Sequence, residues 1–250
     1  MDLDLALLIG VFIFASALLY SSVGHGGGSG YLAVMALFAV SPEVMRPAAL
    51  VLNIGVSSVA AWSYHRRGAF SFRVWWPFAV TAVPLAFVGG RLDVPGLVYQ
   101  PLLAVVLLYS AWWLLSPRSV PVDDPDLRPP LVPALGAGMG MGLLAGLTGI
   151  GGGIFLSPLL LLNRWAATRT TSAVSAVFIL VNSSAGLAGQ ATTVTAIPWN
   201  AALVWVPLAL VGGFLGSRYG ARTGATKAIY RLLAVVLLVA ATKLVLTTFG

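Results

Sequence analysis

The feature of this sequence that most constrains its fold is a series of ten apolar segments separated by short polar links. The segments cover residues 5–23, 30–40, 47–64, 74–90, 97–115, 131–147, 154–162, 173–189, 197–217 and 228–246. Most of them approach the roughly 20 residues with which an α-helix crosses a bilayer. Only 8% of the residues are charged, too few for the surface of a soluble fold, in which about a quarter are charged. The sequence therefore predicts an all-α integral membrane protein.

The cysteine and histidine content limits the chemistry open to the chain. There are no cysteines and two histidines, so we expect no disulfide, no metal site and no cofactor. The net charge is +7, but the basic residues are scattered between apolar segments, which argues against nucleic acid as a partner. The expected partners are membrane lipids and a small substrate, and the oligomeric state stays open.

The two halves of the chain carry the same series of matches. The matched pairs are Gly24–Gly28 with Gly149–Gly153, Arg46 with Arg169, Gly89–Arg91 with Gly216–Arg218, and Leu102–Leu108 with Leu232–Leu238. One match between apolar stretches carries little weight, but four in the same order indicate a repeated unit. We expect a single transmembrane domain over 1–250, with repeat one at 1–116, a linking loop at 117–130 and repeat two at 131–250.

The positions of the basic residues predict the topology. The acidic start Met1-Asp2-Leu3-Asp4 lacks the basic region of a signal peptide, so the first segment is expected to remain in the membrane. If the segments alternate sides, eleven of the fourteen Lys and Arg residues share one side: Arg66, Arg67, Arg73, Arg118, Arg128, Arg164, Arg169, Arg218, Arg222, Lys227 and Arg231. This side is expected to be cytoplasmic, with both chain termini outside a bacterial inner (plasma) membrane. Five segments per repeat is an odd number, so we expect the repeats to be inverted.

Each of the two short segments, 30–40 and 154–162, follows a glycine-rich stretch. Glycine-interrupted segments at matching positions of inverted repeats are typical of secondary transporters. A helix that begins after such a break presents free N–H groups and a positive dipole end, which hold anions. The glycines expected to bind substrate are Gly24, Gly26, Gly27, Gly28, Gly149, Gly151, Gly152 and Gly153. The alternative is that these glycines only let helices pack closely.

The two glycine-rich stretches, residues 24–32 and 149–159, resemble the paired signatures of the TauE/SafE sulfite exporter family. Thr170-Thr171-Ser172 is similar to the family's small-residue stretch that opens the next helix, whereas the first repeat departs from it with Pro47-Ala48-Ala49. The resemblance extends over nearly the whole chain. It implies a carrier of sulfite or of small organosulfonates such as sulfoacetate, with Thr170 and Ser172 among the substrate-binding residues.

Three charged or titratable side chains near the glycine stretches are candidates for binding an anion. A guanidinium binds sulfite or a sulfonate through two parallel hydrogen bonds, so Arg46 and Arg169 are expected to point into a substrate cavity. The alternative is that they reach lipid headgroups, which is our expectation for Arg218 at the end of a long segment. His25, within the first glycine stretch, either binds the anion or only fixes the loop.

Polar residues inside the apolar segments are further candidates. Asn53 and Ser57 lie in the third segment, and Asn182 lies in the eighth. Polar groups at this depth usually face protein or a cavity, so these side chains either bind an oxyanion or bridge helices. None of the seven Asp and Glu residues falls in the middle of a segment. A cavity with arginines and no carboxylate favours an anionic substrate.

The patterns together predict a secondary transporter that works by alternating access around an anion site at the membrane midplane. The alternatives are a carrier of another small inorganic or organic anion, a membrane subunit that transports nothing, and an intramembrane hydrolase. Ser29 lies four residues after His25, but Tyr31 stands where the Gly-x-Ser-x-Gly elbow of a hydrolase needs its last glycine. We therefore expect no enzymatic activity. The particular anion, the direction and any coupling ion stay open.

Overall fold

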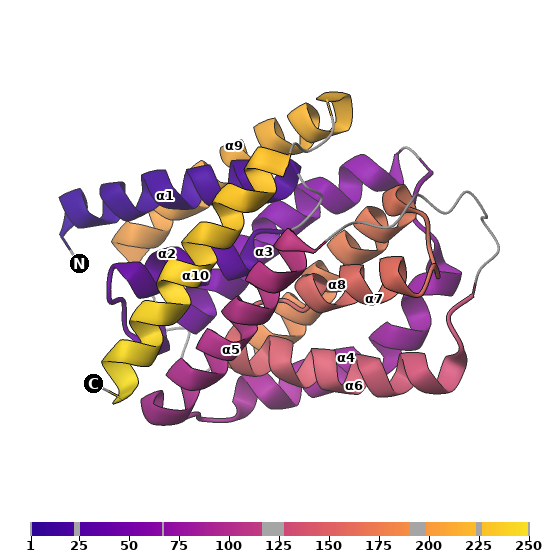
Figure 1. Cartoon of the computed structure of the whole chain (residues 1–250), viewed down its shortest axis with the longest axis horizontal. Helices are drawn as coiled ribbons and strands as arrows, with labels where there is room; N and C mark the ends of the chain where they lie inside the picture. The colour runs from indigo at the N-terminus through magenta and orange to yellow at the C-terminus, as the bar shows by residue number, and fades with distance from the viewer. Residues whose placement is uncertain are drawn as a thin grey trace.

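The computed structural model describes residues 2–22, 26–66, 68–116, 128–190, 199–223 and 227–249. Over these ranges every regular element is an α-helix (Figure 1). The helices are α1 (Leu3–Ser22), α2 (Gly28–Leu37), α3 (Pro42–His65), α4 (Phe72–Arg91), α5 (Gly96–Leu115), α6 (Leu131–Thr148), α7 (Gly153–Leu162), α8 (Thr168–Gly189), α9 (Trp199–Thr223) and α10 (Lys227–Phe249). Eight of them are long and apolar enough to cross a membrane, and α2 and α7 are shorter. The prediction of an all-α integral membrane protein is confirmed.

Two helices begin earlier than the apolar pattern predicts. Helix α3 starts at Pro42 and α8 at Thr168, and both first turns are too polar to belong to an apolar segment. Proline suits the first position of a helix, because an N–H at that position has no partner within the helix. In the first turn of α8, Ser172 donates a hydrogen bond from Oγ to the Thr168 carbonyl oxygen at 3.1 Å. Hydrogen bonds of this kind, from a side chain to the backbone of the same helix, allow the helix to begin before its first buried apolar residue.

The two short helices return to opposite ends of the molecule. Both chain termini lie at one end (Figure 1). Lys243 of α10 donates a hydrogen bond from Nζ to the Leu37 carbonyl oxygen at 2.6 Å, which holds the last turn of α2 at that same end. Helices α1 and α2, which contact each other, therefore form a hairpin. The link from α7 to α8 lies at the opposite end, where α6 begins (Figure 1).

Glycines bring pairs of long helices into backbone contact. Helix α1 packs on α9, α4 packs on α6, and α3 and α8 contact each other. A Cβ on Gly216 of α9 would fall on the Leu18 carbonyl oxygen, and a Cβ on Gly142 of α6 would fall on that of Ala82. If α1 is exchanged with α6, α9 with α4, and α3 with α8, the pair α1–α9 becomes α6–α4 and the pair α3–α8 stays itself. The same three pairs result. A twofold relation between two five-helix units has this property, and the inverted relation itself stays a prediction.

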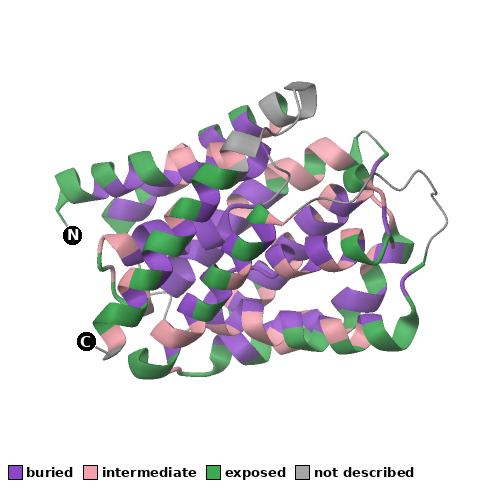
Figure 2. Ribbon diagram, in the orientation of Figure 1, coloured by how far each residue is buried: buried purple, intermediate pink, exposed green. Residues whose placement is uncertain are grey.

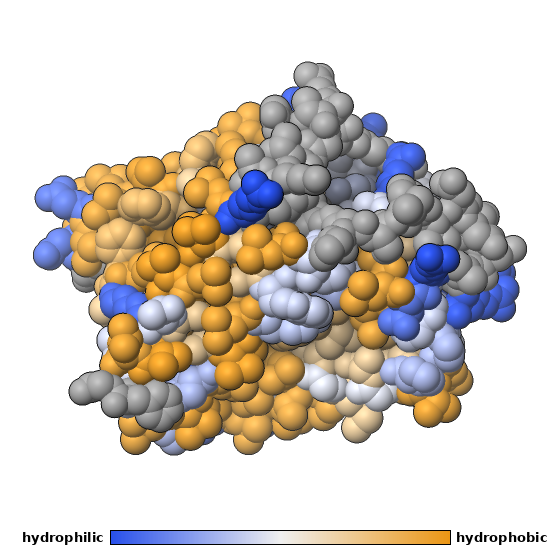
Figure 3. Space-filling model, in the orientation of Figure 1, coloured by the Kyte–Doolittle hydropathy of each residue, from blue (hydrophilic) through white to orange (hydrophobic). Residues whose placement is uncertain are grey.

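Large apolar side chains cover much of the outside of the bundle. Val132, Leu97 and Leu203 are 79%, 78% and 76% exposed, whereas buried residues face the inside (Figure 2). Figure 3 shows a broad hydrophobic surface, with the hydrophilic residues gathered mainly toward the two ends of the molecule. Soluble monomers rarely expose contiguous apolar surface on this scale. The surface therefore suits a hydrocarbon surrounding, with the two ends facing water.

Candidate functional site

The chain breaks before α2 and before α7 share one backbone conformation. Gly27 and Gly152, the residues that precede the two helices, have φ of 88° and 83°. This left-handed conformation favours glycine, because a Cβ would be strained there. A Cβ on Gly28 would fall on the carbonyl oxygen of Ile150. The two breaks, which are far apart in the sequence, are therefore in direct contact, and we call this place the crossing.

The crossing joins the N-termini of two short helices. Helices α2 and α7 have ten residues each, which gives a length of about 15 Å, or half of a hydrocarbon core of roughly 30 Å. Because the helices extend toward opposite ends of the molecule, the crossing lies in the middle of the bundle. The first N–H groups of each helix have no partner within the helix, and both N-termini carry the positive end of the helix dipole.

Asn53 of α3 lies between the two breaks. Its side chain is fully buried, and its Nδ2 donates a hydrogen bond to the Gly149 carbonyl oxygen at 3.2 Å. The same Nδ2 lies 2.8 Å and 3.1 Å from the positions that a Cβ on Gly28 and on Gly151 would take. Only glycines leave room for this amide, so the sequence pattern of glycines and the position of Asn53 belong to one arrangement.

Two serine hydroxyls also approach the breaks. Ser57, one helical turn beyond Asn53 on α3, has its Oγ 3.1 Å from the position of a Cβ on Gly26. Ser183 of α8 has its Oγ 2.7 Å from the corresponding position on Gly151. Ser183 was not among the residues predicted to bind substrate. The feature of the sequence that could have identified Ser183 is its position next to Asn182 inside an apolar segment.

Several polar atoms around the crossing are buried without a hydrogen-bond partner in the described part of the chain. They are Asn53 Oδ1, Ser57 Oγ and Ser183 Oγ. Buried polar atoms of this kind are rare in folded proteins, and each costs about 1–3 kcal/mol. Grouped beside two helix N-termini, they supply hydrogen-bonding capacity that a small polar ligand would use.

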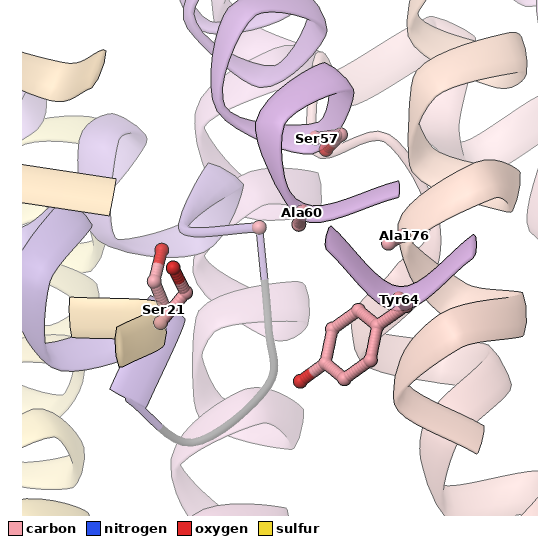
Figure 4. A pocket seen from close by; sticks show the side chains of 7 residues that line it. Ser21, Ser57, Ala60, Tyr64 and Ala176 are labelled. Carbon is pink, nitrogen blue, oxygen red and sulfur yellow. The ribbon is translucent and has the colours of Figure 1, made fainter. Parts of the chain in front are cut away.

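Two small cavities adjoin the crossing and share Gly26 as a wall. One is lined by Ser21 of α1 and by Ser57 and Tyr64 of α3 (Figure 4). The other is lined by the first residues of α2, including Ser29. Each has a volume of about 10 Å³, which is room for about one water molecule. A larger anion would fit only if the helices around the breaks moved apart.

Arg46 is buried beside the second break. Its side chain is 8% exposed, and Nη2 donates hydrogen bonds to the carbonyl oxygens of Gly89 at 3.3 Å, Leu92 at 3.3 Å and Gly146 at 3.4 Å. The guanidinium also lies 5.9 Å from the centre of the Tyr99 ring. In this conformation Arg46 therefore joins α3 to α4 and α6. Contact between Arg46 and an anion stays a prediction.

Two residues that the sequence did not single out hold the second break in place. Tyr99 of α5 donates a hydrogen bond from its hydroxyl to the Thr148 carbonyl oxygen at 3.1 Å. The Thr148 Oγ1 accepts a hydrogen bond from the backbone N–H of Ile150 at 3.4 Å. Together with Thr148 itself, three side chains of the first repeat, those of Tyr99, Asn53 and Arg46, hold the turn from α6 to α7.

The predicted residues of the second repeat are not all brought to the crossing. Arg169, matched to Arg46 in the sequence, is exposed in the first turn of α8, and its neighbour Thr170 is half-buried. Ser172 uses its hydroxyl within α8. The match between the two arginines therefore does not extend to their surroundings. Gly24 and His25 lie outside the described residues.

The bundle consists of membrane-length helices around two short helices, α2 and α7, whose N-terminal breaks meet inside it. This arrangement defines a multi-pass membrane protein with transporter architecture. The chain belongs to the family described as Sulfite exporter TauE/SafE, whose sequence profile it matches over residues 8–244. It is 36% identical, over 96% of this chain and 98% of the relative, to the "Probable membrane transporter protein y4hK" of Sinorhizobium fredii (strain NBRC 101917 / NGR234). It is 27% identical, over 96% and 94%, to the "Probable membrane transporter protein ORF9" of Sinorhizobium sp. No solved structure matches the chain significantly.

Proposed function

We propose that the protein is a secondary transporter of small sulfur-containing anions, either sulfite or organosulfonates such as sulfoacetate, in the bacterial inner membrane. The observation that carries the proposal is the crossing, where two helix N-termini meet beside the unpartnered hydroxyl groups of Ser57 and Ser183. The family description, Sulfite exporter TauE/SafE, supports the sulfur anion. Another small inorganic or organic anion is the second candidate, because the same donors would bind it.

The donors at the crossing suit an oxyanion. Serine hydroxyls, an asparagine Nδ2 and the N–H groups of two helix N-termini all donate hydrogen bonds, and both dipoles favour negative charge. Asp2, Asp4, Glu43 and Asp93, the acids that the structure describes, are all exposed. A sulfite or sulfonate has three oxygens, so it would be able to accept hydrogen bonds from both repeats at once.

The small size of the cavities supports alternating access. The cavities beside the crossing hold about one water molecule each, so an anion at the crossing would be enclosed from both ends. In the proposed mechanism the two hairpins, α1–α2 and α6–α7, move relative to α3 and α8 to open the crossing to one side at a time. With both termini outside, the end at which α3 and α9 finish would face the cytoplasm.

A hydrolase is the weaker alternative. The Ser29 hydroxyl donates a hydrogen bond to the Tyr20 hydroxyl at 3.0 Å, and a neutral phenol is too weak a base to activate a serine. We therefore propose that the chain moves its substrate unchanged. Recovery of chemically unchanged anion after transport would support this proposal, and a hydrolysed product would overturn it.

The decisive experiment measures the flux of sulfite, sulfate, a two-carbon sulfonate and a carboxylate of similar size in proteoliposomes. Ser57→Ala and Ser183→Ala are expected to weaken anion binding by about tenfold or more, because a hydrogen bond to a charged group contributes about 1.5–3 kcal/mol. Both should keep the thermal stability of the wild type, since neither hydroxyl has a hydrogen-bond partner within the residues that the structure describes.

Ser110→Ala is the matched control for these two variants. Ser110 is equally buried, but its Oγ donates to the Val106 carbonyl oxygen within α5 at 2.7 Å. Removing this hydroxyl should leave anion binding unchanged. Wild-type affinity in both Ser57→Ala and Ser183→Ala would reject the crossing as the binding site. Absence of any anion flux from wild-type protein would reject the transporter itself.

A further inference from the structure

A cavity of about 420 Å³ lies between the last turns of α3 and the facing part of α9. We call it the outer cavity. Its walls are formed by Val59, Trp62, Ser63 and Arg66 of α3 and by Phe214, Ser217 and Arg218 of α9. Counted from Val59 and from Phe214, the other residues follow at positions i+3, i+4 and, for Arg66, i+7. This is the spacing of residues that share one face of a helix. The last turns of α3, which line the outer cavity, lie toward the end of the molecule opposite the two chain termini (Figure 1).

Two exposed arginines stand at the outer cavity, each held by an aromatic ring of its own helix. The Arg66 guanidinium lies 5.9 Å from the centre of the Trp62 ring, and the Arg218 guanidinium lies 5.1 Å from that of Phe214. Such contacts contribute about 0.5–1 kcal/mol at exposed sites and limit the directions in which a guanidinium points. Among the described residues, no carboxylate forms an ion pair with either arginine. Their charges are therefore open to an anion from solution.

The outer cavity continues toward the crossing through residues that belong to two cavities at once. Ser217 lines both the outer cavity and the small cavity of Ser21, Ser57 and Tyr64. That small cavity reaches Gly26, which also lines the cavity at the start of α2. The cavities thus form a sequence of neighbouring spaces, lined by hydroxyl groups, from the two arginines to the glycine breaks.

We propose that the outer cavity is an entrance site, at which Arg66 and Arg218 capture the substrate anion before it reaches the crossing. The inference rests on the proposed function and adds a second binding site to it. Planar guanidinium groups bind oxyanions through paired hydrogen bonds, and a positively charged cavity raises the local anion concentration. The shared chemistry is an oxyanion, which either the free substrate or the phosphate of a lipid headgroup would supply.

The test compares Arg66→Gln/Arg218→Gln with the control Arg73→Gln/Arg231→Gln. The control removes the same charge from exposed arginines that do not line the outer cavity. Oriented proteoliposomes receive radiolabelled sulfite from the side at which α3 ends. We expect KM to rise about tenfold in the first variant, with the maximal rate nearly unchanged and the effect reduced at high salt. Sulfite offered from the other side should show wild-type KM.

The outcomes separate this inference from the transporter proposal. An unchanged KM in Arg66→Gln/Arg218→Gln, with normal flux, would overturn the entrance site and leave the transporter in place. An equal rise of KM in Arg73→Gln/Arg231→Gln would also overturn the entrance site, because the effect would then come from the change in net charge. Loss of co-purified anionic lipid, measured by mass spectrometry, together with an unchanged KM would assign the arginines to a headgroup. A rise in KM restricted to the first variant and to one side supports the entrance site.

Discussion

Arg46 is a single residue that joins helices from both halves of the chain. Its Nη2 reaches two carbonyl oxygens at the end of α4 and one near the end of α6. A cation is favourable at the C-terminal end of a helix, where the dipole is negative. A buried charge without such acceptors would be strongly unfavourable. The packing around the second break and the position of Arg46 therefore depend on each other.

This dependence predicts a loss of stability when Arg46 is replaced. We expect Arg46→Leu to lower the free energy of unfolding by about 2–3 kcal/mol, since it leaves buried carbonyl oxygens without a charged donor. The control is Arg73→Leu, at an exposed position in the first turn of α4, where a change within about 0.5 kcal/mol is expected. Denaturation in detergent micelles, followed by circular dichroism, measures both values. Equal losses in the two variants would contradict the role that burial gives to Arg46.

The candidate residues whose position near the breaks the sequence predicted best are polar groups that are costly to bury. Asn53 and Ser57 stood out as polar groups in an apolar segment, and the structure places both at the crossing. Arg169 was selected through its match to Arg46, but a repeated sequence does not fix which side chains a helix end meets. The partners of Arg46 were not predictable for the same reason, since they are backbone carbonyl oxygens of α4 and α6.

The helices were predictable as elements because bilayer thickness sets their length. All ten apolar segments correspond to helices in the described residues, and the two short ones are α2 and α7. The starts of α3 and α8 were missed, because their first turns are polar. Which helices pack together was not predictable from apolar runs, since almost every face of such a helix is hydrophobic. The small residues that decide it become meaningful only when the partner backbone is known.

The pairing of α4 with α6 is expected to depend on one glycine position. A Cβ on Gly142 would fall on the backbone of Ala82, whereas one on Gly140 would meet nothing within 4 Å. We expect Gly142→Ala to cost about 1–3 kcal/mol by forcing the helices apart, and Gly140→Ala to be neutral or slightly stabilising. Thermal unfolding in detergent distinguishes the two. A harmless Gly142→Ala would mean that α4 and α6 do not meet as closely as the structure has them.

At the scale of the whole molecule, the two hairpins give the bundle its functional shape. Each hairpin begins and ends at one end of the molecule, and the two enter from opposite ends (Figure 1). Their tips meet at the crossing, so a small movement of either hairpin changes access from its own end. The outer cavity with Arg66 and Arg218 lies on one of these two routes. Transport in this scheme needs no change in the secondary structure of any helix.

The orientation of this arrangement in the membrane follows from charge and is open to direct measurement. The chain has no cysteine, so single introduced cysteines report without background. Asp4→Cys and Thr247→Cys mark one end of the molecule, and His65→Cys and Asn163→Cys mark the other; all four positions are exposed. We expect a membrane-impermeant maleimide to label the first pair in intact cells and the second pair only after permeabilisation, because the predicted topology puts eleven of the fourteen Lys and Arg residues on the second side.

The pattern of labelling tests two levels of the proposal separately. Labelling of the second pair alone in intact cells would reverse the orientation and place the entrance site outside, while the fold stayed as described. Labelling of Asp4→Cys and Thr247→Cys from different sides would contradict the fold itself. The two termini share a side when α1–α2 and α6–α7 are both hairpins, and also when each pair makes one broken crossing of the membrane, because the number of crossings is even in both cases. In the second case His65→Cys and Asn163→Cys would be labelled from different sides. The labelling of all four positions therefore reports on the two breaks on which the binding site depends.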